Sequence, residues 1–215
     1  MAKSKPAEYQ VHPGVGMVKK WVDGLSGKTG KSLEEWSEVI QRAKLPDHSA
    51  RKAWLKENYG FGGNEAYWLA EYSQGKHTWD FDPDIYLVQA RKYVEEQYAG
   101  PKSALKPIFD AVLAFARTLG DDIRVCPCKT IVPLYRNRVF AELKPATRTR
   151  LELAFALDET PFDPPFTLNP RAQGNDRLRH LIPLMELKDF NSTAKKWLKT
   201  AYKLDEGKKR SLERK

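Results

Sequence analysis

Cationic side chains gather in one stretch of the sequence, where they could bind anions. The chain has a formal net charge of +9, and residues 124–150 contain seven Lys or Arg residues but a single acid, Glu142. Because so few carboxylates are near enough in sequence to neutralise them, we expect an anionic partner, nucleic acid first. Tyr135 could stack on a base beside these cations. The predicted anion-binding residues are Lys129, Tyr135, Arg136, Arg138, Lys144, Arg148 and Arg150. The alternative is a solvated sheet face with cross-strand ion pairs, such as Arg138 with Glu152 or Arg150 with Glu142.

A second chemistry to consider is metal-dependent hydrolysis. Glu142 and Lys144 form a Glu-x-Lys element whose side chains share a face if the segment is a strand. Asp121 and Asp122 lie upstream, where another acid of a PD-(D/E)xK-type nuclease could sit. In such a site carboxylates hold Mg²⁺ and the lysine orients or stabilises the attacking water. The spacing is permissive, so the nuclease is only an alternative, with Asp121, Asp122 and Glu142 as its metal ligands.

Asp176, Arg177 and His180 form a third group with possible chemistry. A histidine near a carboxylate and an arginine could transfer protons or bind an anion. No nucleophile can be identified beside them, so a surface ion pair and a half-buried histidine are the alternative interpretation. No other motif for catalysis, metal or cofactor binding is present, and a non-catalytic protein without a cofactor is expected.

Two Gly-Lys pairs in GLSGKTGKS resemble a phosphate-binding loop, but their spacing does not fit one. That loop needs a glycine five residues before its Gly-Lys pair, where this chain has Leu25 for one pair and Val22 for the other. Ser32 and Glu35 instead have the spacing of a helix capping box. The segment is therefore predicted to be a turn between two helices.

Composition and cysteine usage predict a globular cytoplasmic protein. Hydrophobic residues make up 41% of the chain, no apolar run is long enough for a membrane span, and the N-terminus lacks a hydrophobic signal core. Cys126 and Cys128 lack a second cysteine pair that would complete a structural zinc site. Two reduced thiols are expected, with a two-thiol redox or metal role as the alternative.

The elements that must position these residues fall into two predicted domains. Residues 15–76 show helical periodicity and cap signals, and 77–83 has the polar, Gly- and Pro-containing composition of a linker. Residues 84–204 begin with helical patterns that include Pro101–Gly120, then change to period two. Alternation in Leu151–Leu157 predicts a strand with one core face and one wet face. We predict an α+β domain, with an antiparallel sheet of about five strands packed against helices. An extended or disordered N-terminus (1–14) and a basic tail (205–215) complete the layout.

The chain also resembles a bacterial family whose two domains have no assigned function. TGKSLEEW, WLKENYGFG and EAYWLAE are similar to its helical N-terminal module, and VCPCKTIVPLYRNRVFAELKPATRTR to its second domain. The resemblance implies the two-domain layout, a cytosolic bacterial setting and an α+β second domain, but no catalytic residues. Relatives of the second domain also occur beside nuclease-like domains. Departures are Leu151–Ala154, where an Arg-x-Asp-Leu-Gly pattern is expected, and an eroded glycine-rich stretch before Asp176.

These observations predict a binding module for an anionic partner, nucleic acid first, that acts through a basic sheet and turn surface. The alternatives are the metal-dependent nuclease and a protein–protein adaptor that docks through the helical module.

Overall fold

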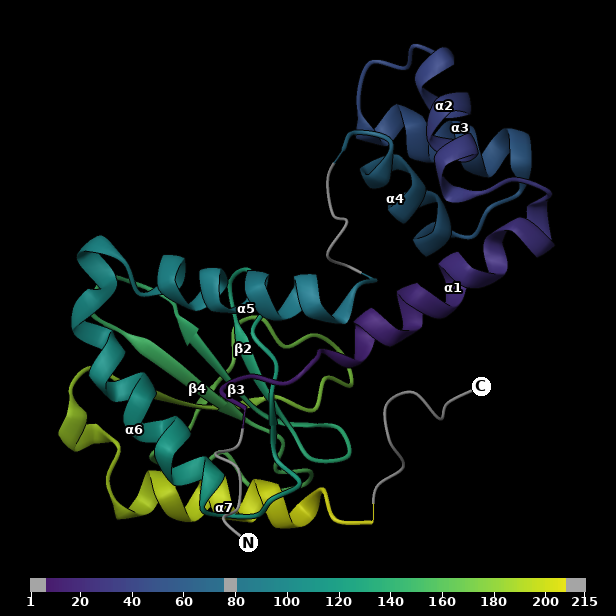
Figure 1. Cartoon of the computed structure of the whole chain (residues 1–215). Coiled ribbons are helices and arrows are strands. Elements are labelled where there is room, and N and C mark those ends of the chain that lie inside the picture. Colours follow the sequence, from purple (N-terminus) through teal and green to yellow (C-terminus); the bar gives the residue numbers. More distant parts are fainter. Residues whose placement is uncertain (1–6, 76–80, 208–215) are drawn as a thin grey trace, which may run out of the picture. The chain divides into compact units, whose positions relative to one another are not determined.

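The computed structural model describes residues 7–75 and 81–207 (Figure 1). The chain divides into two units: a helical unit, Pro13–Tyr86, and an α+β unit that combines Met1–His12 with Leu87–Lys215. Most of the linker predicted at 77–83 lies outside the described residues. Pro83 already belongs to a helix, and the boundary between the units falls after Tyr86.

The described part of the helical unit contains α1 (Pro13–Thr29), α2 (Leu33–Arg42), α3 (His48–Tyr59) and α4 (Gly63–Tyr72). The predicted capping box is confirmed, because Ser32 Oγ accepts from Glu35 N at 3.2 Å and the Glu35 carboxylate accepts from Ser32 N at 2.6 Å. Gly30 has a φ of 74°, a left-handed conformation that glycine adopts without a steric penalty. The Gly-Lys pairs therefore belong to a helix end and a turn.

The described part of the N-terminus lies against the α+β unit rather than in solution. Gln10 N donates to Val125 O at 2.9 Å, and the Gln10 side-chain oxygen accepts from Val125 N at 2.7 Å. Tyr9 is buried. Residues 7–12 of the segment predicted to be extended or disordered form no helix or strand, and they are held by contacts that the sequence pattern does not reveal.

Helices open the α+β unit: α5 (Pro83–Gln97), the 3₁₀ helix η2 (Gly100–Leu105) and α6 (Lys106–Arg117). The sequence predicted one helix through the last two, but the α-helix starts anew at Lys106. Pro107, next in the chain, lacks an N–H and restricts the residue before it. The apolar residues of α6 recur every three or four positions and form a buried face, with Phe109, Val112 and Ala116 fully enclosed.

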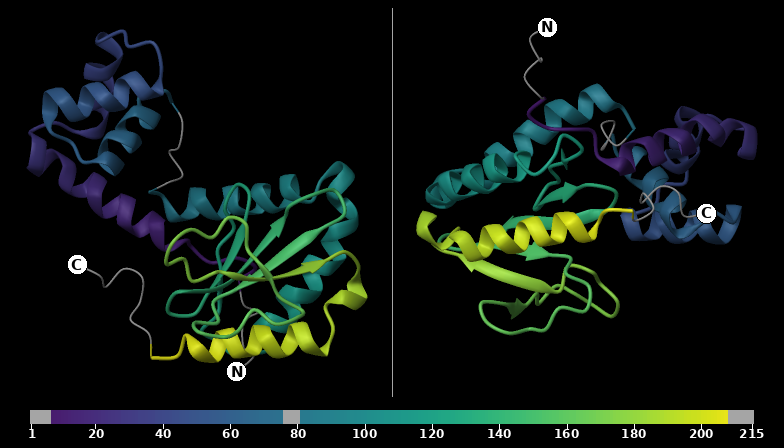
Figure 2. Two further views of the ribbon diagram at one scale, coloured as in Figure 1. Left: turned by 180° about the vertical axis from the view of Figure 1, so that it is seen from behind. Right: turned by 90° about the horizontal axis from the view of Figure 1, so that it is seen from below.

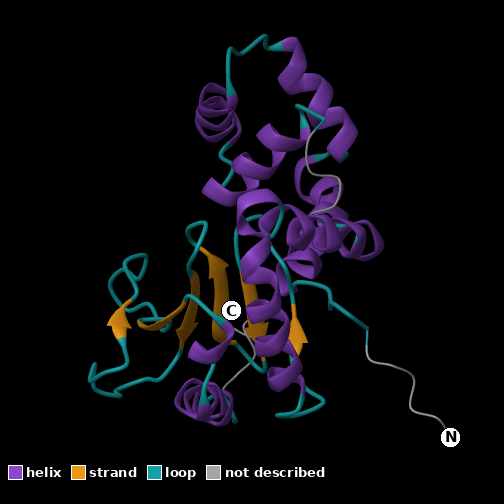
Figure 3. Ribbon diagram, turned by 90° about the vertical axis from the view of Figure 1, so that its left-hand side faces the viewer, coloured by secondary structure: helices purple, strands orange, loops and turns teal. Residues whose placement is uncertain are grey.

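A six-stranded antiparallel sheet forms the centre of this unit, in the order β1-β2-β3-β4-β6-β5. The strands are β1 (Arg124–Val125), β2 (Val132–Tyr135), β3 (Val139–Pro145), β4 (Leu151–Phe155), β5 (Thr167–Leu168) and β6 (His180–Leu184), followed by α7 (Ser192–Leu204). Figures 1 and 2 show α5, α6 and α7 around the sheet, and Figure 3 shows its strands in orange. The predicted α+β fold is confirmed. The extra short strand, β5, lies in the proline-containing segment between β4 and β6.

Both faces of β3 and β4 are buried, which corrects the prediction of one wet face. Leu143 pairs with Leu153 on the apolar face. On the other face, Glu142 and Glu152 are only 9% and 5% exposed. The segment between β4 and β6 provides Arg171, whose guanidinium binds both carboxylates. The polar residues alternate along the strands as they would on a solvent-exposed face, but Arg171, which is distant in sequence, shields Glu142 and Glu152 from solvent.

Candidate anion-binding cleft

The six predicted cations do not share one surface, because they lie at opposite ends of β3. Arg136 and Arg138 are in the turn before this strand. Lys144 is near the end of the strand, and Arg148 and Arg150 follow it in the next turn. A strand advances about 3.3 Å per residue, so the two turns are on the order of 20 Å apart. The expected contiguous surface is not formed.

The two arginines in the turn between β2 and β3 form ion pairs with carboxylates. Arg136 Nε donates to Asp122 Oδ2 at 2.7 Å, a hydrogen bond that raises the pKa of Arg136, and its guanidinium lies 4.3 Å from the ring centre of Tyr202. Arg138 Nε lies 3.7 Å from Asp205 Oδ1, and the Arg138 backbone N–H donates to Asp205 Oδ2 at 2.7 Å. Asp205, the first residue of the predicted basic tail, is completely buried. This end of the hairpin is a structural ion-pair cluster.

Tyr135 does not present its ring to a base. Its side chain is buried, and Tyr135 Oη lies 3.0 Å from His12 Nε2. Burial raises the pKa of Tyr135 and lowers the pKa of His12. The prediction that Tyr135 stacks on a ligand is therefore wrong, because the N-terminal segment covers it.

Glu142 of the Glu-x-Lys element is part of an ion-pair network. Arg171 Nη2 contacts Glu142 Oε1 at 2.5 Å, and Arg171 Nη1 contacts Glu152 Oε2 at 2.5 Å. Arg150 adds a second pair to Glu152 at 3.2 Å. Arg150 therefore pairs with Glu152 rather than Glu142, and Arg138 pairs with Asp205 rather than Glu152. The reason is that the segment between β4 and β6 brings Arg171 to Glu142, and the end of α7 brings Asp205 to Arg138.

The acids of the proposed nuclease site do not converge. Asp122 accepts from Tyr202 Oη at 2.6 Å and from Arg136, whereas Glu142 is held by Arg171. Asp121 is exposed beside Asp122. Within residues 7–75 and 81–207, no three His, Cys, Asp or Glu side chains are placed to hold a metal ion.

Asp176, Arg177 and His180 also have separate partners. Arg177 donates to Asp205 Oδ1 at 3.2 Å, and Asp176 accepts from Gln173 N at 3.3 Å. His180 is buried, stacks on Phe162 and donates from Nε2 to Thr160 O at 2.7 Å. A carbonyl accepts this bond, so the proton is on Nε2. The structure does not assemble these three residues into an acid–base group.

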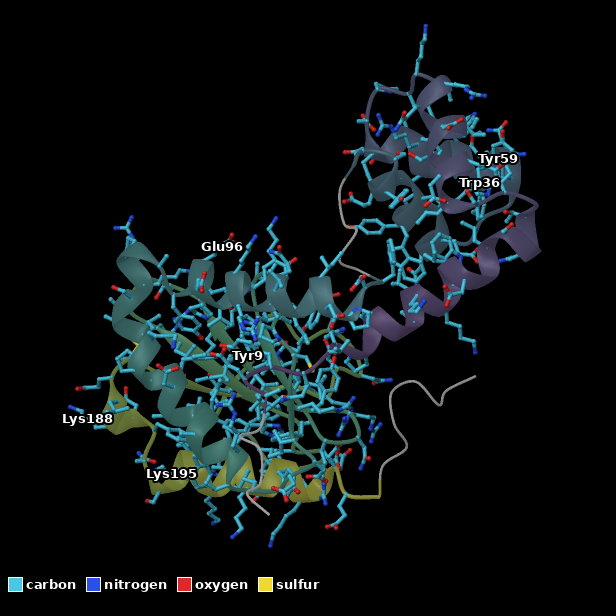
Figure 4. The ribbon with its side chains drawn as sticks, viewed as in Figure 1. Tyr9, Trp36, Tyr59, Glu96, Lys188 and Lys195 are labelled. Carbon is cyan, nitrogen blue, oxygen red and sulfur yellow. The ribbon has the colours of Figure 1, made fainter. Side chains whose placement is uncertain are left out.

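The remaining predicted cations, Lys129, Lys144 and Arg148, line one cleft of about 550 Å³. The end of α5 and the start of η2 form one wall of it, and the loop before β2 and the β3–β4 turn form the other. Glu96 lies on α5 (Figure 4). The full lining is Glu96, Gln97, Ala99, Pro101, Lys102, Lys129, Thr130, Lys144, Pro145, Ala146 and Arg148.

Two hydrogen bonds brace these walls. Gln97 Nε2 donates to Cys128 O at 2.7 Å, which ties the end of α5 to the loop before β2. Lys102 Nζ donates to Pro145 O at 2.6 Å, which ties η2 to the β3–β4 turn. Cys128 N also donates to Ile131 O at 2.8 Å and closes the loop that carries Lys129. The cleft is held in shape by the fold rather than by a ligand.

The charge in this cleft is largely uncompensated. Among the described residues, none of Lys129, Lys144 and Arg148 forms an ion pair. Lys102 donates one N–H to a carbonyl, which is neutral and supplies no compensating negative charge. Glu96 is the single acid in the lining. Four cations against one carboxylate in a concave site attract anions.

Cys128 lies next to the cleft, and burial disfavours the reactive thiolate form of both cysteines. Both are free thiols, and burial raises the pKa of Cys126 to about 12 and that of Cys128 to about 11. Each therefore stays protonated near neutral pH, and a protonated thiol is a poor nucleophile and metal ligand.

Sequence reasoning missed Glu96, Gln97 and Lys102. These residues are distant in sequence from the basic stretch, and each fits an ordinary helical pattern. The break at Gly100-Pro101 was the available signal, because it places Lys102 where one helix ends and another begins.

Comparisons with known proteins match both units to families. Residues 18–74 match a domain of unknown function (DUF4287), and residues 94–205 match another domain of unknown function (DUF5655). The searches of curated proteins and of solved structures found no match. In the described part of the chain, no helix has the length and apolar character needed to cross a membrane. Since the second match covers more than half of the chain, the protein belongs to the DUF5655 family, with a DUF4287 domain before it.

Proposed function

We propose that the α+β unit is a non-catalytic binding module for the phosphates of nucleic acid, with the cleft as its site. One observation carries this proposal. Of the predicted cations, those without a carboxylate partner, Lys129, Lys144 and Arg148, all line the same cleft. Cations that stabilised the fold would be expected in ion pairs, as Arg136 and Arg150 are.

The size of the cleft favours a flexible ligand. Its volume of about 550 Å³ is within the range of small-molecule sites. A rigid duplex presents its phosphates on a convex rod, whereas a single strand can bend a phosphate into a concave site. We therefore expect single-stranded nucleic acid to bind more tightly than duplex.

The test is a fluorescence titration of the full chain with single- and double-stranded oligonucleotides from 50 to 300 mM salt. Three to four phosphate contacts on a single strand predict that binding weakens about 20- to 50-fold between 50 and 200 mM salt. The triple variant Lys129→Ala, Lys144→Ala, Arg148→Ala removes three contacts of about 0.7 kcal/mol each, which lowers affinity about 30-fold.

The matched control removes three charges outside the cleft: Lys196→Ala, Lys199→Ala and Lys203→Ala, all exposed on α7. It should retain affinity within about threefold, since distant charges act only through the screened field. Equal losses in the two triple variants would refute the cleft as the site, and the absence of binding at 50 mM salt would refute the proposed function.

A further inference from the structure

The helical unit has a concave site of its own, between the α1–α2 turn and the α3–α4 turn. Its volume is about 380 Å³, which is within the range of small-molecule sites. Aromatic side chains and charged side chains both line it. We call it the aromatic hollow and define it by Trp36, Tyr59 and Phe61 together with Lys28, Lys31 and Glu65.

Hydrogen bonds within the helical unit hold the hollow in shape. Trp36 Nε1 donates to Thr29 Oγ1 at 2.8 Å, which ties α2 to the end of α1. The Glu65 carboxylate accepts from Trp21 Nε1 at 3.0 Å and from Gly62 N at 3.0 Å. The hollow therefore exists without a ligand, and the polar atoms of Glu65 are already used by the fold.

Tyr59 presents an aromatic ring at this hollow. It is the last residue of α3, is 45% exposed and lies beside Trp36 (Figure 4). The rings of Trp36 and Trp54 meet that of Tyr59 edge-to-face, with centroids 4.8 and 5.0 Å away. Among the described residues, no ring stacks parallel on Tyr59. A Cβ built on Gly60 would have no neighbour within 4 Å, so the space beside the ring is open to a flat ligand.

The charged side chains of the hollow favour an anion. Lys28 Nζ donates to Glu65 Oε1 at 2.7 Å, and this hydrogen bond lowers the pKa of Glu65. A lysine has three N–H groups, so Lys28 keeps two for another acceptor. In the part of the chain that the structure describes, no carboxylate pairs with Lys31. Two lysines against one carboxylate give the hollow a net positive charge, which suits a phosphate.

We infer that the aromatic hollow binds an unpaired nucleobase and its phosphate, with the base stacked on Tyr59 and the phosphate on Lys28 and Lys31. An exposed ring flanked by cations binds single strands of any sequence, because every base has a flat face. A phosphate alone has no use for the ring, and a cationic ligand is repelled by the lysines. The inference goes beyond the proposed function, because it gives the helical unit a site for the same class of ligand.

The experiment titrates the full chain at about 100 mM salt with a DNA single strand and with an abasic strand of equal length, which has the phosphates but no bases. We expect the ordinary strand to bind about tenfold more tightly, an effect typical of stacking one base on an aromatic side chain. Tyr59→Ala should remove this difference and leave the affinity for the abasic strand within about twofold. Tyr59→Phe keeps the ring and should bind both strands as the unmodified protein does.

Tyr67→Ala is the matched control, because Tyr67 is 43% exposed on α4 and does not line the hollow. It should leave both affinities unchanged. Lys31→Ala should weaken both strands about threefold, whereas Lys20→Ala, which removes an exposed lysine of α1 outside the hollow, should weaken neither. Equal losses in Tyr59→Ala and Tyr67→Ala overturn the inference. Equal affinity of the unmodified protein for the two strands also overturns it, as for a hollow that docks a protein partner.

Photocrosslinking of the unmodified chain to a strand that contains iodouracil locates the base without any substitution. Peptide mass spectrometry should find the crosslink at Tyr59, and crosslinks confined to other residues overturn the inference. The same measurement on the triple variant of the cleft separates the two proposals. A crosslink at Tyr59 that persists in this variant supports the hollow even if the cleft fails as a site. Affinity that depends on the cleft cations but not on Tyr59 overturns the inference and leaves the proposed function standing.

Discussion

Replacement of Arg171 by Met tests whether this arginine holds the polar face of the sheet together. Arg171 makes two contacts of 2.5 Å, to Glu142 on β3 and to Glu152 on β4. Both glutamates are at least nine-tenths buried, so each would keep a charge away from water after the guanidinium is lost. Methionine fills part of the same volume without supplying a donor.

The size of the effect follows from these contacts. Breaking a buried ion pair by removing one partner costs about 3–5 kcal/mol. Arg150 still pairs with Glu152 at 3.2 Å, and the Arg171 side chain is 30% exposed, so the lower limit applies. We expect Arg171→Met to lower the free energy of unfolding of the α+β unit by about 3 kcal/mol.

Hydrogen exchange of the β3 and β4 amides in increasing urea measures this loss separately from the helical unit. Adding Glu142→Gln should recover about 1–2 kcal/mol, because the neutral amide no longer needs a cation. Arg148→Ala, which removes a cation without an ion-pair partner in the described chain, is the control and should change stability by less than about 0.5 kcal/mol. A loss below about 1 kcal/mol in Arg171→Met, or no recovery with Glu142→Gln, would refute the reasoning.

Three further predictions concern packing, capping and thiol reactivity. Gly120→Ala places a Cβ 2.1 Å from Tyr202 Oη, so it should destabilise the α+β unit by about 1–3 kcal/mol in thermal unfolding. Adding Tyr202→Phe should restore part of this stability, and an unchanged melting temperature in Gly120→Ala would contradict the prediction. Ser32→Ala should cost the helical unit about 1 kcal/mol in urea unfolding monitored by tryptophan fluorescence, and a loss of less than about 0.3 kcal/mol would contradict a capping role. Burial raises the pKa of Cys126 to about 12 and that of Cys128 to about 11, so few thiolates are present at pH 8. Alkylation of the two cysteines at this pH should therefore be at least about 100-fold slower in the native protein than in urea. Equal rates would contradict their burial.

Local patterns in the sequence were enough to predict most helices and the α+β class. A capping box depends on residues three positions apart, and a buried helix face on residues three or four apart, so Ser32 and Phe109 could be placed from the sequence. The alternation of Leu151 to Leu157 likewise located β4. The short β5 was missed because its two residues carry no recognisable period.

The basic stretch was a weaker guide to the site. It contains Lys129, Lys144 and Arg148, which line one cleft, but also Arg136, Arg138 and Arg150, which form ion pairs in the fold. Charge density along the chain cannot distinguish these two groups. From the sequence, a cation can be predicted to be paired only if an acid lies near it in the chain. The acids that pair with these arginines are mostly distant in sequence, so this criterion fails.

The sequence by itself determined the helices, the antiparallel strands and the excess of cations in residues 124–150, because these depend on neighbours within a few positions. Only the tertiary structure decided which cations remain unpaired. Asp205 of the last helix end reaches Arg138, and Arg171 reaches Glu142, across separations that no periodicity encodes. The same packing brings the end of α5 beside the β3–β4 turn and forms the cleft, because burial of the apolar faces sets which distant segments meet.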